Sequence, residues 1–158
     1  MIKEEVKKRL DGKVNNWFVK NPKRVYFSIA KEDLKEVAKI LYFDLNMRLS
    51  TVSGVDNEDS FELIYHFGAD STGEMFNVRV FLYDKNNSEI DSLTGMFKAS
   101  DWIEREIHEM LGVNFIGHPN QKHLLLDEDW PTGNFPLRKS CAPEKKPYPL
   151  EEEINNNG

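Results

Sequence analysis

The hydrophobic and polar positions along the chain predict three helices. In residues 2–10 an apolar residue recurs at every fourth position among charges, which is typical of an amphipathic helix. Residues 31–46 and 99–112 also carry apolar residues at helical spacing. The last segment has helix-end signals as well, because Ser100 can cap its first turn and Gly112 can end it. Its expected buried stripe consists of Ile103, Ile107, Met110 and Leu111.

Four other segments have the composition and alternation of β-strands: residues 24–29, 47–56, 61–68 and 75–84. The turn-rich "ADSTGE" between the last two predicts a hairpin. Both of these strands carry apolar residues on their two faces, whereas a sheet with one face in water needs only one apolar set. Either helices cover both faces of the sheet, or one face contacts a partner.

This order of elements predicts an α+β fold with a mostly antiparallel sheet of about four strands and flanking helices. The α+β domain is expected to span residues 1–112. Residues 113–141 lose the periodicity but stay rich in Leu, Phe and Trp, which a solvated loop does not need. We therefore predict that they form an irregular docking strap of the same domain, and that residues 142–158 form a mobile tail.

Composition and charge exclude several classes of function. The formal net charge of −6 disfavours nucleic-acid binding, which usually needs a basic face. No apolar run is long enough for a membrane helix, and the charged N-terminal segment is unlike a signal peptide. We therefore expect a soluble, cytoplasmic chain. Its single cysteine, Cys141, excludes an iron–sulfur cluster built by this chain alone, because such clusters are normally held by several thiolates.

The densest group of chemically versatile residues is "EREIHEMLGVNFIGHPNQKHLLL", residues 104–126. Glu104 and His108 lie four residues apart on one helical face and His118 follows, so these three are the candidates for a metal site in a free-standing metal-dependent enzyme. The spacing departs from the paired-histidine zinc motif. The other interpretation is a solvated or docked helix face on which charges alternate in sign: Glu104, Arg105, Glu106 and Glu109.

Several separate elements of residues 104–139 occur together in a specific order. They are Glu104, Arg105, Glu106, Glu109, Gly112, Gly117, His118, Pro119, Leu125, Trp130, Pro136, Leu137, Arg138 and Lys139. Together these residues resemble the signature of the 30-kDa subunit of respiratory complex I, which is the C subunit of the bacterial NADH-quinone oxidoreductase. The same domain occurs in the related membrane-bound, energy-converting nickel–iron hydrogenases.

The resemblance implies a subunit with no cofactor and no catalytic residue of its own. Iron–sulfur clusters and any nickel–iron centre would lie on partner subunits. The matching residues would form the interface with the catalytic large subunit and the iron–sulfur small subunit, in a soluble arm on the cytoplasmic face of the membrane. The function implied is that of an assembly subunit of a complex I-like, ion-translocating oxidoreductase.

Two types of complex remain open, because the electron donor and acceptor would bind to other chains. One type oxidises NADH and reduces quinone, and the other is a membrane-bound hydrogenase. The Trp-Pro pair and the longer spacer of "DWPTGNFPLRK" slightly favour the hydrogenase type.

Overall fold

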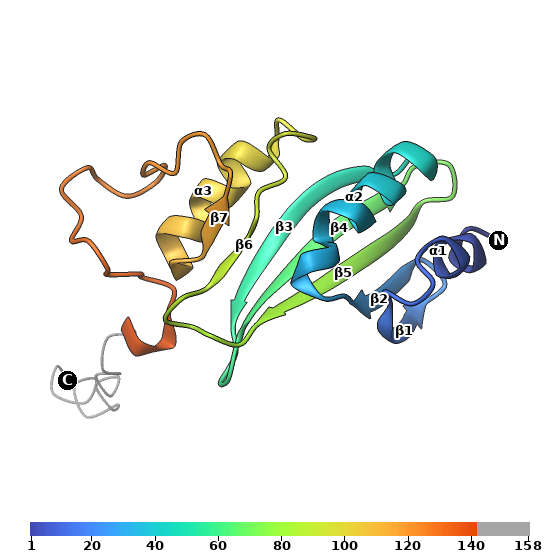
Figure 1. The fold of residues 1–158 in the computed structure, drawn as a ribbon, viewed down its shortest axis with the longest axis horizontal. Helices are drawn as coiled ribbons and strands as arrows, with labels where there is room; N and C mark the ends of the chain where they lie inside the picture. The colour runs from blue at the N-terminus through green and yellow to red at the C-terminus, as the bar shows by residue number, and fades with distance from the viewer. Residues whose placement is uncertain (142–158) are drawn as a thin grey trace, which may run out of the picture.

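The computed structural model describes residues 1–141 and contains a five-stranded sheet with the strand order β1-β2-β5-β4-β3 (Figure 1). All neighbouring strands run antiparallel except β2 and β5, which are parallel. The elements of this unit are α1 (Ile2–Arg9), β1 (Asn15–Asn21), β2 (Arg24–Ser28), η1 (Lys31–Asp33), α2 (Leu34–Lys39), η2 (Ile40–Asp44), β3 (Arg48–Asp56), β4 (Phe61–Ala69) and β5 (Glu74–Leu82).

A smaller unit lies beside β3 and includes two short parallel strands, β6 (Glu89–Asp91) and β7 (Asn114–Ile116), with α3 (Ser100–Leu111) between them in the sequence. In Figure 1 the segment after β7 runs outward past α3 and then returns to the turn η3 (Lys139–Cys141). The segment predicted to be irregular, residues 113–141, contains β7 and η3, and from here on the strap means the part between them, residues 117–138. No helix within residues 1–141 is long and apolar enough to cross a membrane.

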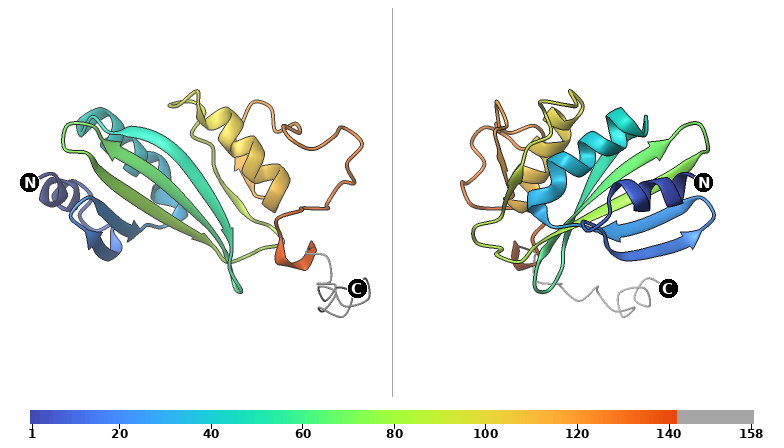
Figure 2. Two further views of the ribbon diagram at one scale, coloured as in Figure 1. Left: turned by 180° about the vertical axis from the view of Figure 1, so that it is seen from behind. Right: turned by 45° about the vertical axis from the view of Figure 1, so that its right-hand side comes forward.

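The core lies on one face of the large sheet. Alternate residues of β4, from Phe61 to Phe67, are fully buried, and they join a single apolar cluster with side chains of α1 and α2. Burial of a large apolar side chain stabilises the fold by roughly 1.5–3 kcal/mol, so this layer supplies most of the driving force. Figure 2 shows α1 and α2 on this side of the sheet.

The sequence leaves open whether helices cover both faces of the sheet, and in residues 1–141 the opposite face shows that they do not. Within the described residues no helix covers it; Ile64 and Phe81 are half-buried, and Tyr83 is exposed. Polar side chains at its centre bond to one another across the strands, among them Arg79 and Glu62. The second apolar set therefore forms a partly exposed surface.

The predicted fold class is confirmed, since the structure is α+β with a mostly antiparallel sheet. The structure adds one strand to the main sheet and a small parallel pair to the fold. The sequence does not predict β1 because "NNWFVKN" is an edge strand with little apolar alternation and mostly exposed residues. The sequence predicts that residues 113–141 are irregular, but they begin with the strand β7, in which Phe115 is buried. The predicted tail, residues 142–158, lies outside the described residues.

The prediction of one regular helix over residues 31–46 is wrong. The structure divides it into a 3-10 turn, a short α-helix and a π-turn, η2. A π-turn takes more residues per turn than an α-helix. It directs Leu41 and Leu45 into the core, while Tyr42 and Phe43 stay at the surface, where Tyr42 packs edge-on against Phe97.

Helix α3 matches its predicted range and ends at Gly112, as expected, with a left-handed φ of 79°. The predicted N-terminal cap is wrong: Ser100 lies inside the helix, and its buried hydroxyl has no hydrogen-bond partner among the described residues. Ile107 and Leu111 are buried, whereas Ile103 and Met110 are only half-buried. Two acidic residues of this helix, Glu104 and Glu109, are buried instead.

Close contact between α3 and β3 depends on Gly54. A Cβ atom at this position would lie 2.7 Å from Cδ1 of Leu111, which is too close for unaltered packing. We predict that Gly54→Ala lowers the free energy of unfolding by about 1–3 kcal/mol, as overpacking usually does. Gly95→Ala is the matched control, because nothing lies within 4 Å of the Cβ atom that an alanine would add there. Urea denaturation measures both, and equal stability of the two variants would contradict the close contact.

Candidate functional site

The centre of the candidate site is the carboxylate of Glu109, which binds the backbone of the strap. It accepts hydrogen bonds from the N–H groups of Leu124, Leu125 and Leu126, at 2.9, 2.8 and 3.3 Å. His123 lies 3.4 Å away. Burial raises the pKa of Glu109, but these hydrogen bonds outweigh it and bring the pKa below the ordinary glutamate value. Glu109 therefore holds the strap as a charged, fully bonded side chain.

Arg105 lies one helical turn before Glu109 and faces the same segment. Its Nε donates to the carbonyl of Lys122 at 3.0 Å, and its Nη2 donates to the carbonyl of His123 at 2.7 Å. The sequence suggested that Arg105 pairs with acids along a charge ladder. In the structure its guanidinium binds backbone carbonyls of its own chain. Arg105 and Glu109 thus hold consecutive residues of the strap by opposite charges.

Arg138 fixes the returning end of the strap. Its Nε donates to the carbonyl of Leu111 at 2.7 Å, and its guanidinium lies between the rings of Phe61 and Phe135, 5.0 and 4.5 Å from their centroids. A Cβ atom on Gly112 would lie 2.6 Å from both Arg138 and Phe135. Glycine is therefore needed at position 112 for two reasons: its backbone is left-handed, and a Cβ atom would collide with Arg138 and Phe135.

Lys139 joins the strap to the main sheet. Its backbone N–H donates to the carboxylate of Asp56 at 2.8 Å, at the end of β3. Asp56 also forms an ion pair with Lys85. Burial raises the pKa of Asp56, but Lys85 and the Lys139 N–H outweigh it, so the pKa lies below its ordinary value. The strap is thus anchored on α3 at one end and on the sheet at the other.

Glu104 faces away from the strap. A helix turns by about 100° per residue, so residues five apart point about 140° away from each other. The buried Glu104 carboxylate accepts hydrogen bonds from the hydroxyl of Ser92 at 2.6 Å and from the N–H of Leu93 at 2.7 Å. Burial raises its pKa and outweighs these hydrogen bonds, so its pKa lies above the ordinary value.

The three candidate metal ligands have separate partners. Glu104 binds Ser92 and Leu93, whereas His108 donates from Nδ1 to the carbonyl of Val113 at 2.9 Å. His118 accepts from the N–H of Asn120 at Nδ1, so Nε2 carries its proton and lies 3.1 Å from the carbonyl of Asp101. Within residues 1–141 no group of three His, Cys, Asp or Glu side chains is arranged to hold a metal ion. The geometry therefore does not assemble the site that the metal-enzyme alternative requires.

The other signature residues lie mainly at the surface of the strap and α3. Leu125 and Leu137 are both 62% exposed. Glu106 and Pro119 are exposed, and Pro136 is half-buried. Trp130 is half-buried and donates from its indole to the carbonyl of Asn134 at 2.8 Å. Gly117 has a positive φ of 83° in open space.

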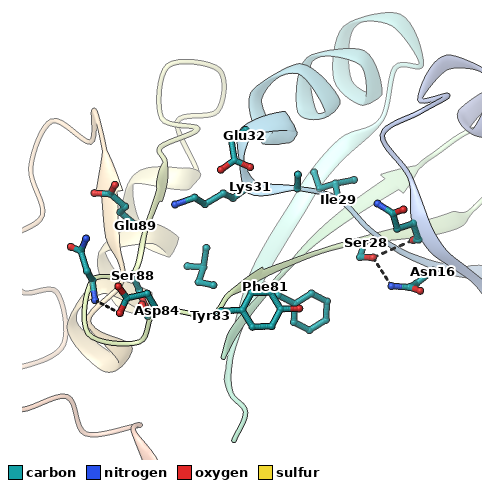
Figure 3. A pocket seen from close by; sticks show the side chains of 14 residues that line it. Asn16, Ser28, Ile29, Lys31, Glu32, Phe81, Tyr83, Asp84, Ser88 and Glu89 are labelled. Atoms are coloured by element: carbon teal, nitrogen blue, oxygen red, sulfur yellow. Dashed lines mark hydrogen bonds between the residues drawn. The ribbon is translucent and has the colours of Figure 1, made fainter. Parts of the chain in front are cut away.

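One cavity adjoins α3 and the strap, and a second lies at the end of the main sheet. The first, of about 740 Å³, lies between α3 and the strap; its lining includes Arg105, His108, Lys122 and Trp130. The second, of about 530 Å³, lies where β2 and β5 end, and Figure 3 shows the Phe81 and Tyr83 rings on one side of it and Lys31 on the other. The lining of the first cavity contains no serine or cysteine, and the lining of the second contains no histidine, so neither pairs such a nucleophile with a histidine base.

Sequence reasoning missed one polar group on the open face of the sheet. Asn77 donates to the carbonyl of Val25, so its oxygen accepts from Nδ1 of His66 at 2.6 Å. Nε2 of His66 then accepts from the hydroxyl of Ser53 at 2.9 Å. Such an arrangement can activate a serine. The nearby cavity of about 260 Å³ is lined by His66 and Asn77 but not by Ser53, so the group serves as a cross-strand brace.

Comparison with known sequences gives a consistent set of relatives. The family model described as "Respiratory-chain NADH dehydrogenase, 30 Kd subunit" matches residues 27–147. The C subunit of the NADH-quinone oxidoreductase of Citrifermentans bemidjiense is 34% identical over 131 residues, which are 78% of this chain and 80% of that protein. The J subunit of the NAD(P)H-quinone oxidoreductase of Prochlorococcus marinus is 52% identical over 62 residues, or 39% of this chain and 34% of that protein.

Some relatives are longer than the matching part. The C/D subunit of the NADH-quinone oxidoreductase of Bacteroides thetaiotaomicron is 35% identical over 83 residues, and the match covers 52% of this chain but only 15% of that protein.

Comparison with solved structures supports the fold. A chain of the membrane-bound sulfane sulfur reductase, an archaeal respiratory membrane complex, superposes with a TM-score of 0.80 at 20% identity, covering 89% of this chain and 84% of that chain. A trypsin-resistant fragment of Nqo5 has a TM-score of 0.63 at 21% identity, covering 75% and 96%.

We predict that Glu109→Gln releases the strap. An amide has one acceptor oxygen, and its NH₂ group would face the N–H groups that the carboxylate now binds. Hydrogen bonds to charged groups contribute about 1.5–3 kcal/mol each, so we expect a loss of about 2–4 kcal/mol in the stability of this segment. Hydrogen exchange at Leu124, Leu125 and Leu126 should accelerate strongly. Glu106→Gln, an exposed change on the same helix, is the control.

The same variant should alter the response to acid. Because folding lowers the pKa of Glu109 below 4.5, its contribution is present above that pH and is lost as the pH falls through the lower, folded value. The stability difference between the native chain and Glu109→Gln should therefore shrink on acidification. A constant difference from neutral pH down to strongly acidic pH would contradict a charged Glu109.

Proposed function

Since the chain belongs to the family of the 30-kDa subunit of respiratory-chain NADH dehydrogenase, we propose that it is a cofactor-free structural subunit of a membrane-bound oxidoreductase. The complex would be complex I-like and ion-translocating, and the chain would lie in its soluble arm on the cytoplasmic face. There it would brace the catalytic large subunit and the adjacent iron–sulfur subunit. No bond would be made or broken on this chain.

The observation that carries this proposal is that charged residues of the signature bind the chain's own backbone. Arg105, Glu109 and Arg138 bind backbone groups of the chain itself. These groups are fixed structural partners, whereas a catalytic acid or base must face a substrate. What the strap exposes instead is apolar surface, chiefly at Leu125 and Leu137. We take these exposed leucines, held on an anchored segment, as part of the surface that contacts a partner subunit.

For the type of complex, the names of the relatives are stronger evidence than the spacer in "DWPTGNFPLRK". The relatives from Citrifermentans bemidjiense and Prochlorococcus marinus are named as parts of quinone oxidoreductases, which supports the NADH- or NAD(P)H-linked, quinone-reducing type for this chain. A nickel analysis of the complex that purifies with the chain separates the two types. Stoichiometric nickel in the large subunit would favour the hydrogenase type.

Docking through the strap predicts a clear effect of two surface substitutions. The double variant Leu125→Ser, Leu137→Ser should recover at least tenfold less large subunit when the tagged chain is purified from its host, since losing about 1.4 kcal/mol of apolar contact weakens binding tenfold. Its own stability should change by less than about 0.5 kcal/mol, as is usual for surface positions.

Phe43→Ser is the matched control for this experiment. Phe43 is 61% exposed, as much as the two leucines, but it lies on η2 and not on the strap. Unchanged recovery with the leucine double variant, or an equal loss with Phe43→Ser, would place the docking surface elsewhere.

The absence of a cofactor is tested on the chain purified alone. We expect no visible absorption, no paramagnetic signal and no reductase activity with viologen dyes, because the chain has one cysteine, and His66, His108 and His118 bond to protein groups. A reproducible iron–sulfur spectrum or stoichiometric bound metal in the isolated chain would contradict the structural role.

A further inference from the structure

A row of hydrogen bonds leads from the buried carboxylate of Glu104 to the surface. Oε2 of Glu104 accepts from the hydroxyl of Ser92 at 2.6 Å. The hydroxyl oxygen of Ser92 lies 2.8 Å from the hydroxyl of Thr94, and it also accepts from the Thr94 N–H at 3.1 Å. Glu104 is only 1% exposed and Ser92 is buried, whereas Thr94 is half-buried. Oε2 of Glu104 and the hydroxyl oxygens of Ser92 and Thr94 thus form a continuous row from the buried carboxylate to a partly exposed residue.

This row is fully satisfied in two protonation states. When Glu104 is charged, Ser92 donates to the carboxylate and accepts from the Thr94 hydroxyl and N–H. When Glu104 is protonated on Oε2, the carboxyl group donates to Ser92, and Ser92 donates to Thr94 instead. Only the positions of the hydroxyl hydrogens differ between the two states, because a hydroxyl group both donates and accepts. The oxygen of Glu104 that binds the Leu93 N–H is unchanged.

We propose that Glu104, Ser92 and Thr94 form a proton-uptake site, in which a proton from solvent enters at Thr94 and reaches the buried carboxylate through two hydroxyl groups. The proton arriving at Thr94 displaces that hydroxyl's own proton to Ser92, and Ser92 passes its proton to Oε2. One proton is gained, one carboxylate becomes a carboxylic acid, and no heavy atom has to move. The site stores a proton inside the fold without opening it.

The groups around Glu104 favour storage at this residue. Tyr65 of β4 lies in the field of Glu104 and of Asp91 on β6, and burial with these two charges raises the pKa of Tyr65 well above its usual value. Tyr65 therefore keeps its own proton. Asp91 is paired with Lys35 of α2, 3.3 Å away.

Two further groups act on Glu104 in opposite directions. In its charged form His118, which follows β7, lowers the pKa of Glu104, and Asp101 on α3 raises it. The neutral form of His118, in which Nδ1 accepts from the Asn120 N–H, has no such effect. His118 and Asp101 lie 3.4 Å apart, so their influences partly cancel. Burial is the largest cause and leaves the pKa of Glu104 raised.

The test is a pH titration of the 158-residue chain labelled with ¹³C at the glutamate side-chain carboxyl, followed by NMR. We expect one carboxyl to titrate above the ordinary glutamate value, and its signal to vanish in Glu104→Gln. In Thr94→Val the protonated state leaves the Ser92 hydroxyl without an acceptor, whereas the charged state stays satisfied. The midpoint of Glu104 should therefore shift to lower pH in this variant.

Glu106→Gln is the control, because Glu106 is exposed on the same helix and its removal should leave the Glu104 midpoint unchanged. Thr94→Val is a nearly isosteric change at a half-buried position, so its result does not depend on whether Glu104→Gln folds. A Glu104 midpoint at or below the ordinary value would overturn the proton site. An unchanged midpoint in Thr94→Val would overturn the relay through the two hydroxyl groups.

Discussion

The strap has a defined course because one buried carboxylate collects three consecutive backbone N–H groups. Residues 124–126 form no helix or strand, so their N–H groups need other partners. Glu109 supplies an acceptor for all three, and Arg105 supplies donors for the carbonyls just before them. An irregular segment thereby gains the hydrogen bonding that regular structure would have provided. The exposed side chains that it carries are consequently held in fixed positions.

Helix α3 combines three different contacts on its three sides. Ile107 and Leu111 pack on β3 at Gly54, Arg105 and Glu109 bind the strap, and Glu104 binds the turn after β6. The two buried acids have opposite pKa shifts for a physical reason. Glu109 accepts from three N–H groups and lies beside His123, which together outweigh its burial, whereas burial outweighs the two donors of Glu104. Glu109 therefore stays charged to a lower pH than an ordinary glutamate, whereas Glu104 becomes protonated at a higher pH than an ordinary glutamate.

The sequence predicts what depends on local pattern. Strands β4 and β5, helix α3 and its end at Gly112 follow from alternation, helical spacing and a glycine at the right place. The contacts of Glu109 could not be predicted this way, because its partners lie 15 to 17 residues further along the chain, in a segment without periodicity. The same limit applies to Ser100: its side chain could cap a helix, but the helix begins one residue earlier than the cap requires. The edge strand β1 carries no buried residue, so its sequence has no alternation of buried and exposed positions from which a strand could be predicted.

The resemblance of residues 104–139 identified the family more directly than it identified the role of each residue. Charged signature residues suggested contacts with partner subunits, yet Arg105, Glu109 and Arg138 bind groups of their own chain. In the proposed docking this internal role still serves the partner contact, because the three residues hold the segment that exposes Leu125 and Leu137. A surface loop with free backbone groups would lose conformational entropy on docking. A strap that is already anchored on α3 and on Asp56 has lost most of that freedom during folding, so its apolar contacts can contribute more fully to binding.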